Sequence, residues 1–275
     1  MAGPASVRAG ELRLAYREAG EGPAVLLLHG WPTSSFLWRN VMPPIARTRR
    51  VIALDLPGYG ASDKPTDVTY SYAFYSDAVA GFLDVLGIGD VAIGLHDLGG
   101  PVGMRFALDH PDRVRAIALT NTLLYPEDTT EFLTQFVEGL KTPGLRDNFT
   151  SAQGLEVALR LGTSTDSAVN DESLAGIVEP FRSDEDRLAL AKAGSELEDE
   201  VTARFPRELP GVRVPVRIVY GTDDRILQTI EATVARLRRD LPQAEVTALD
   251  GVGHFLQEDD PERLGELLAE FFERH

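Results

Sequence analysis

The sequence predicts an α/β fold: a mostly parallel central sheet with helices on both faces, interrupted by a helical insertion. Short runs of apolar, branched residues alternate with helical spacing up to residue 124 and again after residue 210. Residues 125–210 show only helical patterns between polar loops. Parallel neighbours need right-handed crossovers, and 275 residues suffice for one such unit with an insertion.

The first part of the sheet is expected from five short segments. Residues 11–19 alternate with period two until Gly20-Glu21-Gly22-Pro23, which indicates an antiparallel strand and a turn. Uninterrupted apolar runs are typical of strands covered on both faces. These runs are Ala24–Leu28, Val51–Leu54, Val91–Leu95 and Val114–Thr120. Helices are expected between them at Ser35–Ala46 and about Tyr72–Leu86, and after the third run from Gly99.

The later elements divide the chain into three parts. Helical patterns in the insertion include Thr130–Leu140 and Asp184–Phe205. Alternation resumes with strands at Val214–Tyr220 and Glu245–Leu249 and helices at about Gln228–Leu241 and Pro261–Phe272. We therefore expect a core of residues 1–124 and 211–275, with a helical cap of residues 125–210 over the carboxyl ends of the strands.

Composition excludes several partners. Acidic residues number 43 against 27 basic ones, a net charge of −16, whereas nucleic acids and anionic membranes need a basic face. Three acidic runs are interpreted as solvated surface: Ser183 to Asp186, Glu196 to Glu200 and Glu258 to Asp260. Without cysteine, a leader-like N-terminus or a long apolar run, we expect a cytoplasmic protein.

One stretch has the pattern of a nucleophile elbow. The apolar run ends at Leu95, a tight turn carries Asp97, and Gly99-Gly100 open a helix. Glycines permit a strained strand-to-helix turn that lifts one side chain above the sheet. A partly desolvated carboxylate aimed at an electrophilic carbon can form an ester. Asp97 is therefore the candidate nucleophile.

Two further side chains follow later strands, where open α/β sheets place their sites. Asp224 lies in Tyr220-Gly-Thr-Asp-Asp-Arg, and His254 lies in Gly251-Val-Gly-His-Phe. His254 would activate water to cleave the ester, and the acid would hold its tautomer and stabilise the imidazolium. Asp223 competes for the acid role, and the offset from Gly221 favours Asp224.

The backbone N–H groups of Leu98 and Trp31 are the expected oxyanion donors. His29 and His96 are interpreted as braces of the neighbouring turns rather than reactive groups. No spacing of ligand residues predicts a metal site, and the chemistry outlined needs no cofactor.

Four segments together resemble α/β-hydrolases of the haloalkane dehalogenase and epoxide hydrolase branch. They are His29-Gly-Trp-Pro-Thr-Ser-Ser-Phe-Leu-Trp-Arg-Asn, Asp55-Leu-Pro-Gly-Tyr-Gly-Ala-Ser-Asp-Lys-Pro, His96-Asp-Leu-Gly-Gly and His254-Phe-Leu-Gln-Glu-Asp-Asp-Pro-Glu. The resemblance covers the core on both sides of residues 125–210 and implies that fold and aspartate-ester chemistry. The order nucleophile, acid, histidine is also that of α/β-hydrolases.

The resemblance does not decide whether the leaving group is a halide or an epoxide oxygen. Haloalkane dehalogenases usually carry a tryptophan donor after the nucleophile, where this chain has Leu98, although the Trp31 indole could replace it. Epoxide hydrolases use cap tyrosines, and the insertion offers only Tyr125. Fluoroacetate dehalogenases carry an arginine in place of Leu98. Some dehalogenases keep the acid after the sixth strand, where Asn121 stands; its amide either points into the pocket or is structural.

Halide displacement is the preferred prediction, because halide needs only polarising donors whereas an epoxide oxygen needs a proton. The expected substrate is a small, uncharged, mostly apolar molecule. Epoxide opening remains the alternative. A receptor or a cofactor-free oxygenase built on the same fold is a second alternative, since fold alone does not decide function.

Overall fold

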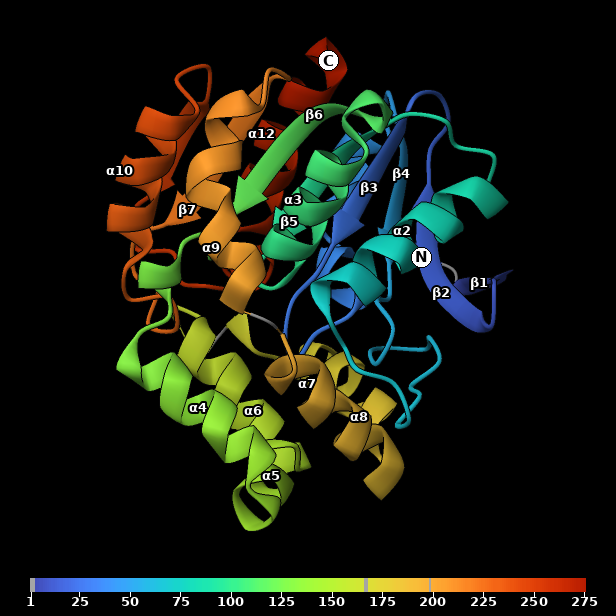
Figure 1. The fold of residues 1–275 in the computed structure, drawn as a ribbon, viewed down its shortest axis with the longest axis vertical. Helices are drawn as coiled ribbons and strands as arrows, with labels where there is room; N and C mark the ends of the chain where they lie inside the picture. The colour runs from blue at the N-terminus through green and yellow to red at the C-terminus, as the bar shows by residue number, and fades with distance from the viewer. Residues whose placement is uncertain (1–2, 166–167, 198) are drawn as a thin grey trace.

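The computed structural model describes residues 3–165, 168–197 and 199–275. Its centre is a sheet with helices on both faces, and further helices lie at one end (Figure 1). Within the described residues the sheet has eight strands in the order β1-β2-β4-β3-β5-β6-β7-β8. The strands are β1 Ala5–Ala9, β2 Leu12–Ala19, β3 Ala24–Leu28, β4 Arg50–Leu54, β5 Val91–His96, β6 Val114–Thr120, β7 Val216–Gly221 and β8 Glu245–Leu249.

Most of the sheet is parallel, as predicted. β1 pairs with β2 and β2 with β4 in antiparallel fashion, and the other neighbours are parallel. The predicted bounds of β3, β6 and β8 are confirmed to the residue. The edge strand β1 was not predicted, because its residues are largely exposed and lack an apolar run.

Two apolar layers hold the helices against the sheet. Leu26 and Leu28 of β3 face a core that includes residues of α2, α3 and α10, whereas Val25 and Leu27 face α1 and α12. This alternation follows from side chains pointing to opposite faces along a strand. The helices are α1 Met42–Ile45, α2 Tyr72–Val85, α3 Gly99–Asp109, α10 Ile230–Asp240, α11 Leu256–Asp259 and α12 Pro261–Arg274.

The helix predicted at Ser35–Ala46 is wrong. A 3₁₀ helix, η1 (Ser35–Trp38), and the short α1 replace it. Pro43 and Pro44 lack the backbone N–H that a continuous helix would need, so the chain can only begin a new helix there. Trp38, the last residue of η1, and Arg39, which follows it, are both buried, and Trp38 belongs to the apolar layer that also contains residues of β3 and α12.

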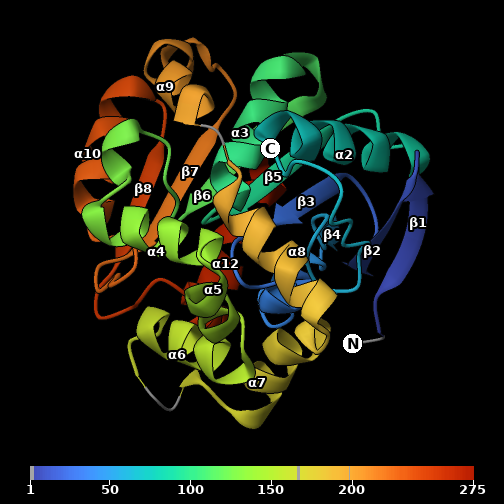
Figure 2. The ribbon, with the colours of Figure 1, turned by 60° about the horizontal axis from the view of Figure 1, so that its bottom comes forward.

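The insertion contains helices throughout its described part. They are α4 Glu131–Lys141, α5 Pro143–Phe149, α6 Ala152–Gly162, α7 Asp171–Val178, α8 Asp184–Ser195 and α9 Asp199–Glu208. The single helix predicted at Asp184–Phe205 is therefore two. The arrowheads of β3 and β6 point toward α4–α8 in Figure 1, and Figure 2 shows these helices from the cap side.

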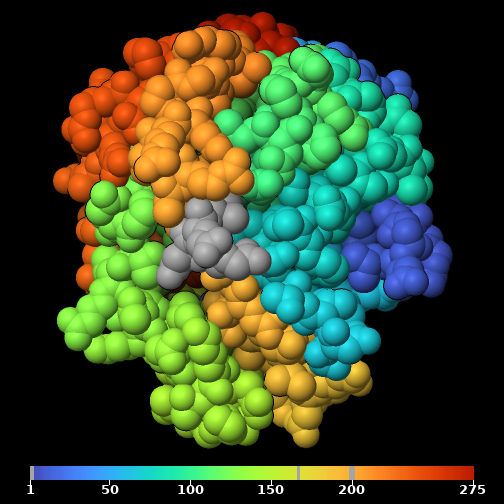
Figure 3. All heavy atoms as spheres, in the orientation of Figure 1, coloured from blue at the N-terminus to red at the C-terminus, as the bar shows by residue number. Residues whose placement is uncertain are grey.

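The helix α9 returns to the core and packs against α3. We propose that the cap over the strand ends consists of α4–α8, within the expected segment 125–210. The cap helices lie directly below the core in the space-filling view (Figure 3). Among the described residues, no helix has the length and apolar character to cross a bilayer.

Substitution of Gly221, the last residue of β7, tests how tightly the core is packed. A methyl group on Gly221 would overlap the carbonyl oxygens of Val252 and Gly253, whereas one on Gly211 would meet no atom within 4 Å. Gly221→Ala should therefore lower the free energy of unfolding by about 2–3 kcal/mol. The matched control Gly211→Ala should change it by less than about 1 kcal/mol. Urea denaturation measures both, and equal unfolding midpoints would contradict the packing argument.

Candidate active site

Asp97 lies on a strained turn between β5 and α3. Its φ is 49°, in the left-handed region that residues other than glycine rarely adopt. The turn is held from both sides: the backbone N–H of Asp97 donates to the Asn121 carbonyl at 3.0 Å, and the Thr122 hydroxyl donates to the Asp97 carbonyl at 2.7 Å. A side chain on Gly99 would overlap the carbonyl oxygen of Leu28. The strained elbow expected from the sequence is therefore present.

The carboxylate of Asp97 receives two backbone N–H groups. The Trp31 N–H donates to Asp97 Oδ2 at 2.9 Å, and the Leu98 N–H also bonds to this carboxylate. The Gly30-Trp31 turn can approach so closely because a side chain on Gly30 would overlap Asp97. Both expected oxyanion donors therefore lie at the nucleophile candidate, one from the turn after β3 and one from the start of α3.

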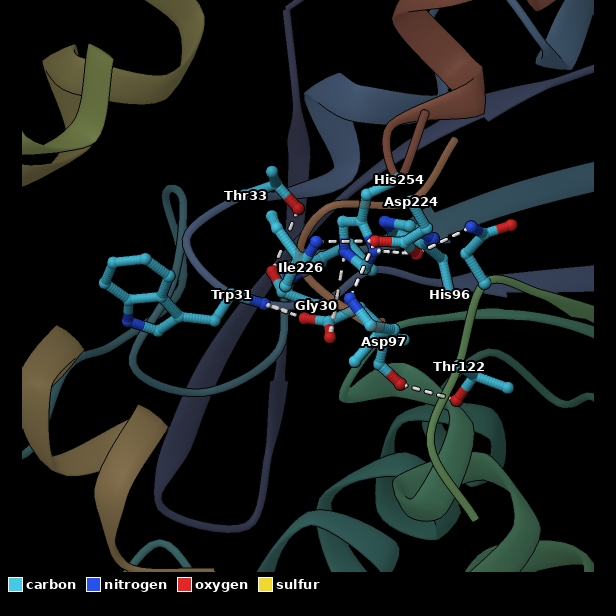
Figure 4. Close-up of polar contacts among 12 residues, drawn as sticks. Gly30, Trp31, Thr33, His96, Asp97, Thr122, Asp224, Ile226 and His254 are labelled. Atoms are coloured by element: carbon cyan, nitrogen blue, oxygen red, sulfur yellow. Dashed lines mark hydrogen bonds and ion pairs between the residues drawn. The ribbon is translucent and has the colours of Figure 1, made fainter. Parts of the chain in front are cut away.

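His254 lies between two carboxylates (Figure 4). Its side chain is 1% exposed, its Nδ1 donates to Asp224 Oδ2 at 2.8 Å, and its Nε2 lies 3.8 Å from Asp97 Oδ1. Asp223 is exposed, and Asp224 is the carboxylate that contacts the imidazole. With Nδ1 donating to Asp224, the Nε2 lone pair faces Asp97 and can accept a proton.

Backbone and amide donors hold Asp224 in place. Asp224 Oδ1 accepts from the N–H groups of Ile226 and Leu227 at 2.8 and 2.7 Å. Asp224 Oδ2 accepts from Asn121 Nδ2 at 2.7 Å as well as from His254. Asn121 also accepts from the Gly221 N–H at 2.9 Å. The side chain of Asn121 thus supports the acid, and its placement in the leaving-group pocket is corrected.

The three groups have shifted pKa values. Burial raises the pKa of Asp97, although the charge of His254 and the two N–H groups oppose that rise. Burial also acts to raise the pKa of Asp224, but the charge and hydrogen bond of His254 outweigh it and hold the pKa at about 2. Burial acts to lower the pKa of His254, and the charge of Asp224 overcomes it, so that this pKa is raised. Asp224 therefore stays ionised beside an imidazole that gains a proton readily.

Two neutral imidazoles brace the turns, as predicted. His29 Nδ1 donates to the Gly30 carbonyl at 2.9 Å, and its Nε2 accepts from the Leu56 N–H at 3.1 Å. His96 Nδ1 donates to the Thr120 carbonyl at 3.1 Å, and its ring lies 4.7 Å from that of His254. Burial lowers the pKa of both imidazoles, so they remain uncharged.

Tyr125 lies away from the cavity, which corrects its expected role as a leaving-group donor. Its hydroxyl donates to Asp240 Oδ2 at 2.7 Å, and Arg236 covers its ring at 4.0 Å. Burial and Asp240 raise the pKa of this phenol well above its ordinary value. No local sequence pattern indicates that Tyr125 binds Asp240 of α10, because the two residues are far apart in the chain.

A cavity of about 550 Å³ leads from Asp97 into the cap. Most of its wall is apolar, including Leu98, Phe136 and Leu161. Tyr72, the first residue of α2, also lines the cavity; the sequence did not predict this, because Tyr72 belongs to the core segment and not to the insertion. Among the described residues, no three His, Asp or Glu side chains cluster as metal ligands would.

The Trp31 indole also lines the cavity but points away from the Asp97 side chain in Figure 4. It packs edge-on against Phe136 of α4 at 4.7 Å, and its Nε1 faces Gly194 of α8. The backbone of Trp31 therefore contacts the carboxylate while its ring contacts the cap.

Comparison with known families agrees with this geometry. The family model described as alpha/beta hydrolase fold matches residues 23–261. The chain belongs to the α/β-hydrolase fold family. It is similar over nearly its whole length to enzymes of that family, and it is accordingly a hydrolase.

Two curated relatives of this α/β-hydrolase are dehalogenases. Haloalkane dehalogenase 2 of Mycobacterium tuberculosis is 28% identical over 94% of this chain and 91% of the relative. The haloalkane dehalogenase of Sphingobium indicum is 31% identical over 95% of this chain and 92% of the relative.

Solved structures give the same picture. Haloalkane dehalogenase DbeA from Bradyrhizobium elkani matches with a TM-score of 0.85 and 28% identity, over 98% of this chain and 97% of that chain. Epoxide hydrolase CorEH matches with a TM-score of 0.83 over 98% of both chains, and at 23% identity it shows the fold alone.

The role of Asp224 in this α/β-hydrolase can be tested by measuring the pKa of the His254 imidazole. Asp224→Asn removes the charge that raises the pKa of His254, so that pKa should fall. An NMR titration of the His254 imidazole measures the shift. The exposed neighbour gives a matched control, because Asp223→Asn should leave the titration unchanged. An identical His254 pKa in wild type and Asp224→Asn would contradict the assignment.

Proposed function

We propose that this protein is a haloalkane dehalogenase that cleaves carbon–halogen bonds through an ester on Asp97. The observation that carries this proposal is the position of Asp97 at the base of an apolar cavity. Two N–H groups bind its carboxylate, and Asp97 Oδ1 lies 3.8 Å from His254 Nε2. The two dehalogenase relatives support the same reaction.

In the first step, Asp97 Oδ1 attacks the carbon that bears the halogen. A C–O bond forms, the carbon–halogen bond breaks, and halide leaves with the bonding electron pair. Asp97 Oδ2 becomes the carbonyl oxygen of the ester and stays near the Trp31 N–H. Partial desolvation favours this step because it makes the carboxylate a better nucleophile than it is in water.

In the second step, water attacks the ester carbonyl carbon of Asp97 while His254 Nε2 takes a proton from that water. The N–H groups of Trp31 and Leu98 stabilise the oxyanion, and Asp224 stabilises the imidazolium. Collapse of the tetrahedral intermediate breaks the bond from the ester carbon to the alkyl oxygen, and the released alkoxide takes the proton back from His254. The new carboxyl group of Asp97 then gives its own proton to solvent, which restores the carboxylate. The balance is haloalkane plus water to alcohol plus hydrogen halide.

We further propose that Tyr72 stabilises the leaving group. Leu98 offers no side-chain donor after the nucleophile, and the Trp31 indole points toward the cap. Tyr72 lines the same cavity as Asp97, is 3% exposed, and is fixed at the start of α2. A phenol can polarise a departing halide or protonate an epoxide oxygen, so Tyr72 also keeps epoxide opening as the second candidate function.

The covalent mechanism is tested by His254→Phe. This variant should form the Asp97 ester but not hydrolyse it, because no base remains to activate water. Intact and peptide mass spectrometry after incubation with butyl bromide should show an added butyl group on the Asp97 peptide. Wild type should release bromide and keep no adduct. Adduct formation with styrene oxide alone would favour the epoxide reaction, and ligand binding without any adduct would favour a receptor or oxygenase.

Tyr72→Phe should slow formation of the ester by at least about tenfold, because it removes one leaving-group donor. The loss should be larger for butyl chloride than for butyl iodide, since chloride is the poorer leaving group. Tyr75→Phe is the matched control, because Tyr75 is buried in the same helix but does not line the cavity. Rapid quenching in the His254→Phe background measures this step. Equal rates in both tyrosine variants would refute the role of Tyr72.

A further inference from the structure

The third acidic run is not the solvated surface that its sequence predicts. The Glu258 side chain is 3% exposed, and Asp259 is half-buried. Both lie in α11, directly after the loop that carries His254. The first run, from Ser183, opens α8 and is largely exposed, as expected, and Glu198 of the second run lies outside the described residues. Buried charged groups need specific partners, so the contacts of Glu258 and Asp259 indicate what these two carboxylates stabilise.

Asp259 binds two backbone N–H groups from separate parts of the chain. Its Oδ2 accepts from the N–H of Gly253, immediately before His254, at 2.8 Å. The N–H of Ser164, which follows cap helix α6, donates to Oδ1 and Oδ2 at 3.0 and 2.8 Å. A single carboxylate therefore joins the histidine loop to the end of a cap helix. Hydrogen bonds of N–H groups to an ionised acceptor are among the stronger ones in proteins.

The residue on the other side of His254 is tied to the same helix end. The Phe255 N–H donates to the carbonyl of Gly162, the last residue of α6, at 2.9 Å. Carbonyls at a helix C-terminus have no partner within the helix, so Phe255 supplies one. The approach is close, because a side chain on Gly253 would lie 2.6 Å from the Gly162 carbonyl oxygen. Gly253 and Phe255 thus hold His254 between two contacts with the cap.

A buried ion pair makes a second connection between this run and the cap. Arg39 donates to both carboxylate oxygens of Glu258, at 2.6 and 2.9 Å. The hydroxyl of Ser173, on cap helix α7, accepts from Arg39 at 3.0 Å and donates to Glu258 at 2.8 Å. The Arg39 guanidinium also covers the Phe36 ring at 4.1 Å. This cluster anchors α11 to the cap independently of Asp259.

We propose that Asp259 is a positioning residue that fixes His254 by joining its loop to the C-terminal end of α6. The proposal rests on the proposed ester mechanism. Asp259 does not touch the reacting atoms. It holds the Gly253 N–H, and through it the backbone of His254, so that Nε2 stays aimed at the carbonyl carbon of the Asp97 ester. Formation of the ester does not need His254 as a base, whereas hydrolysis does, so loss of Asp259 affects the second step selectively.

The test uses single-turnover quenching of the full-length protein with butyl bromide, which separates ester formation from ester hydrolysis. Asp259→Ala should slow hydrolysis by about tenfold or more, because small displacements of a catalytic group are costly, while ester formation changes less than about twofold. The Asp97 ester should therefore accumulate in the mass spectrum. Asp259→Asn keeps one acceptor oxygen for the shared N–H groups and should recover most of the hydrolysis rate.

The adjacent acid is a matched control. Among the described residues, the Asp260 side chain accepts only a long 3.4 Å bond from the Arg263 N–H at the start of α12, so Asp260→Ala should keep both rates. Thermal unfolding of all three variants separates a folding defect from a positioning effect. Unchanged hydrolysis in Asp259→Ala would overturn the proposal. Equal losses in both steps, or an Asp259→Asn variant as slow as Asp259→Ala, would overturn it as well.

A second measurement does not depend on turnover. The His254 Nδ1 proton, which lies in the hydrogen bond to Asp224, should give a downfield NMR signal in wild type and Asp260→Ala. In Asp259→Ala that signal should shift or broaden, because the loop has lost a contact. An unchanged signal would refute the positioning role. If no ester forms even in His254→Phe, the proposed function fails, and the NMR comparison still decides the role of Asp259.

Discussion

The rest of the site depends on a carboxylate that is kept in an apolar cavity. Burial disfavours the charge of Asp97 and raises its pKa, so the charge must be stabilised locally. The N–H groups of Trp31 and Leu98 and the imidazole of His254 provide that stabilisation. They follow β3, β5 and β8, and only a parallel sheet brings these carboxyl ends to one edge. The fold is thus a means of assembling donors around one buried charge.

The negative charge of Asp97 links the two proposed steps, because it affects the pKa of His254. Asp224 and Asp97 both raise the pKa of His254. When Asp97 becomes an ester its negative charge disappears, and only Asp224 continues to raise that pKa. The pKa of His254 in the ester is therefore lower than in the free enzyme, and a larger fraction of the imidazole is neutral. Formation of the ester in this way prepares the base that the hydrolysis step needs, and hydrolysis is lost as pH falls through the lowered pKa.

The core was predictable because its pattern is local. A strand buried on both faces reads as a continuous apolar run, which located β3, β6 and β8 to the residue. Asp97, Asp224 and His254 follow β5, β7 and β8, whose carboxyl ends lie at one edge of the parallel sheet, so their proximity was predictable too. Partners formed by distant segments leave no such local pattern. Tyr125 binds Asp240 although the sequence predicted it at the leaving group, and Asn121 binds Asp224 where the sequence left a pocket role and a structural role open.

The cap was hardest to predict because one of its helices, α6, both lines the cavity and binds the loop that carries His254. In α6, Val157, Ala158 and Leu161 line the cavity, whereas Gly162 binds the backbone beside His254. A helical period identifies which residues share a face, but it does not say whether that face meets substrate, core or another helix. Because α6 both lines the cavity and binds the histidine loop, we expect that a shift of α6 to accommodate a larger substrate would also displace His254.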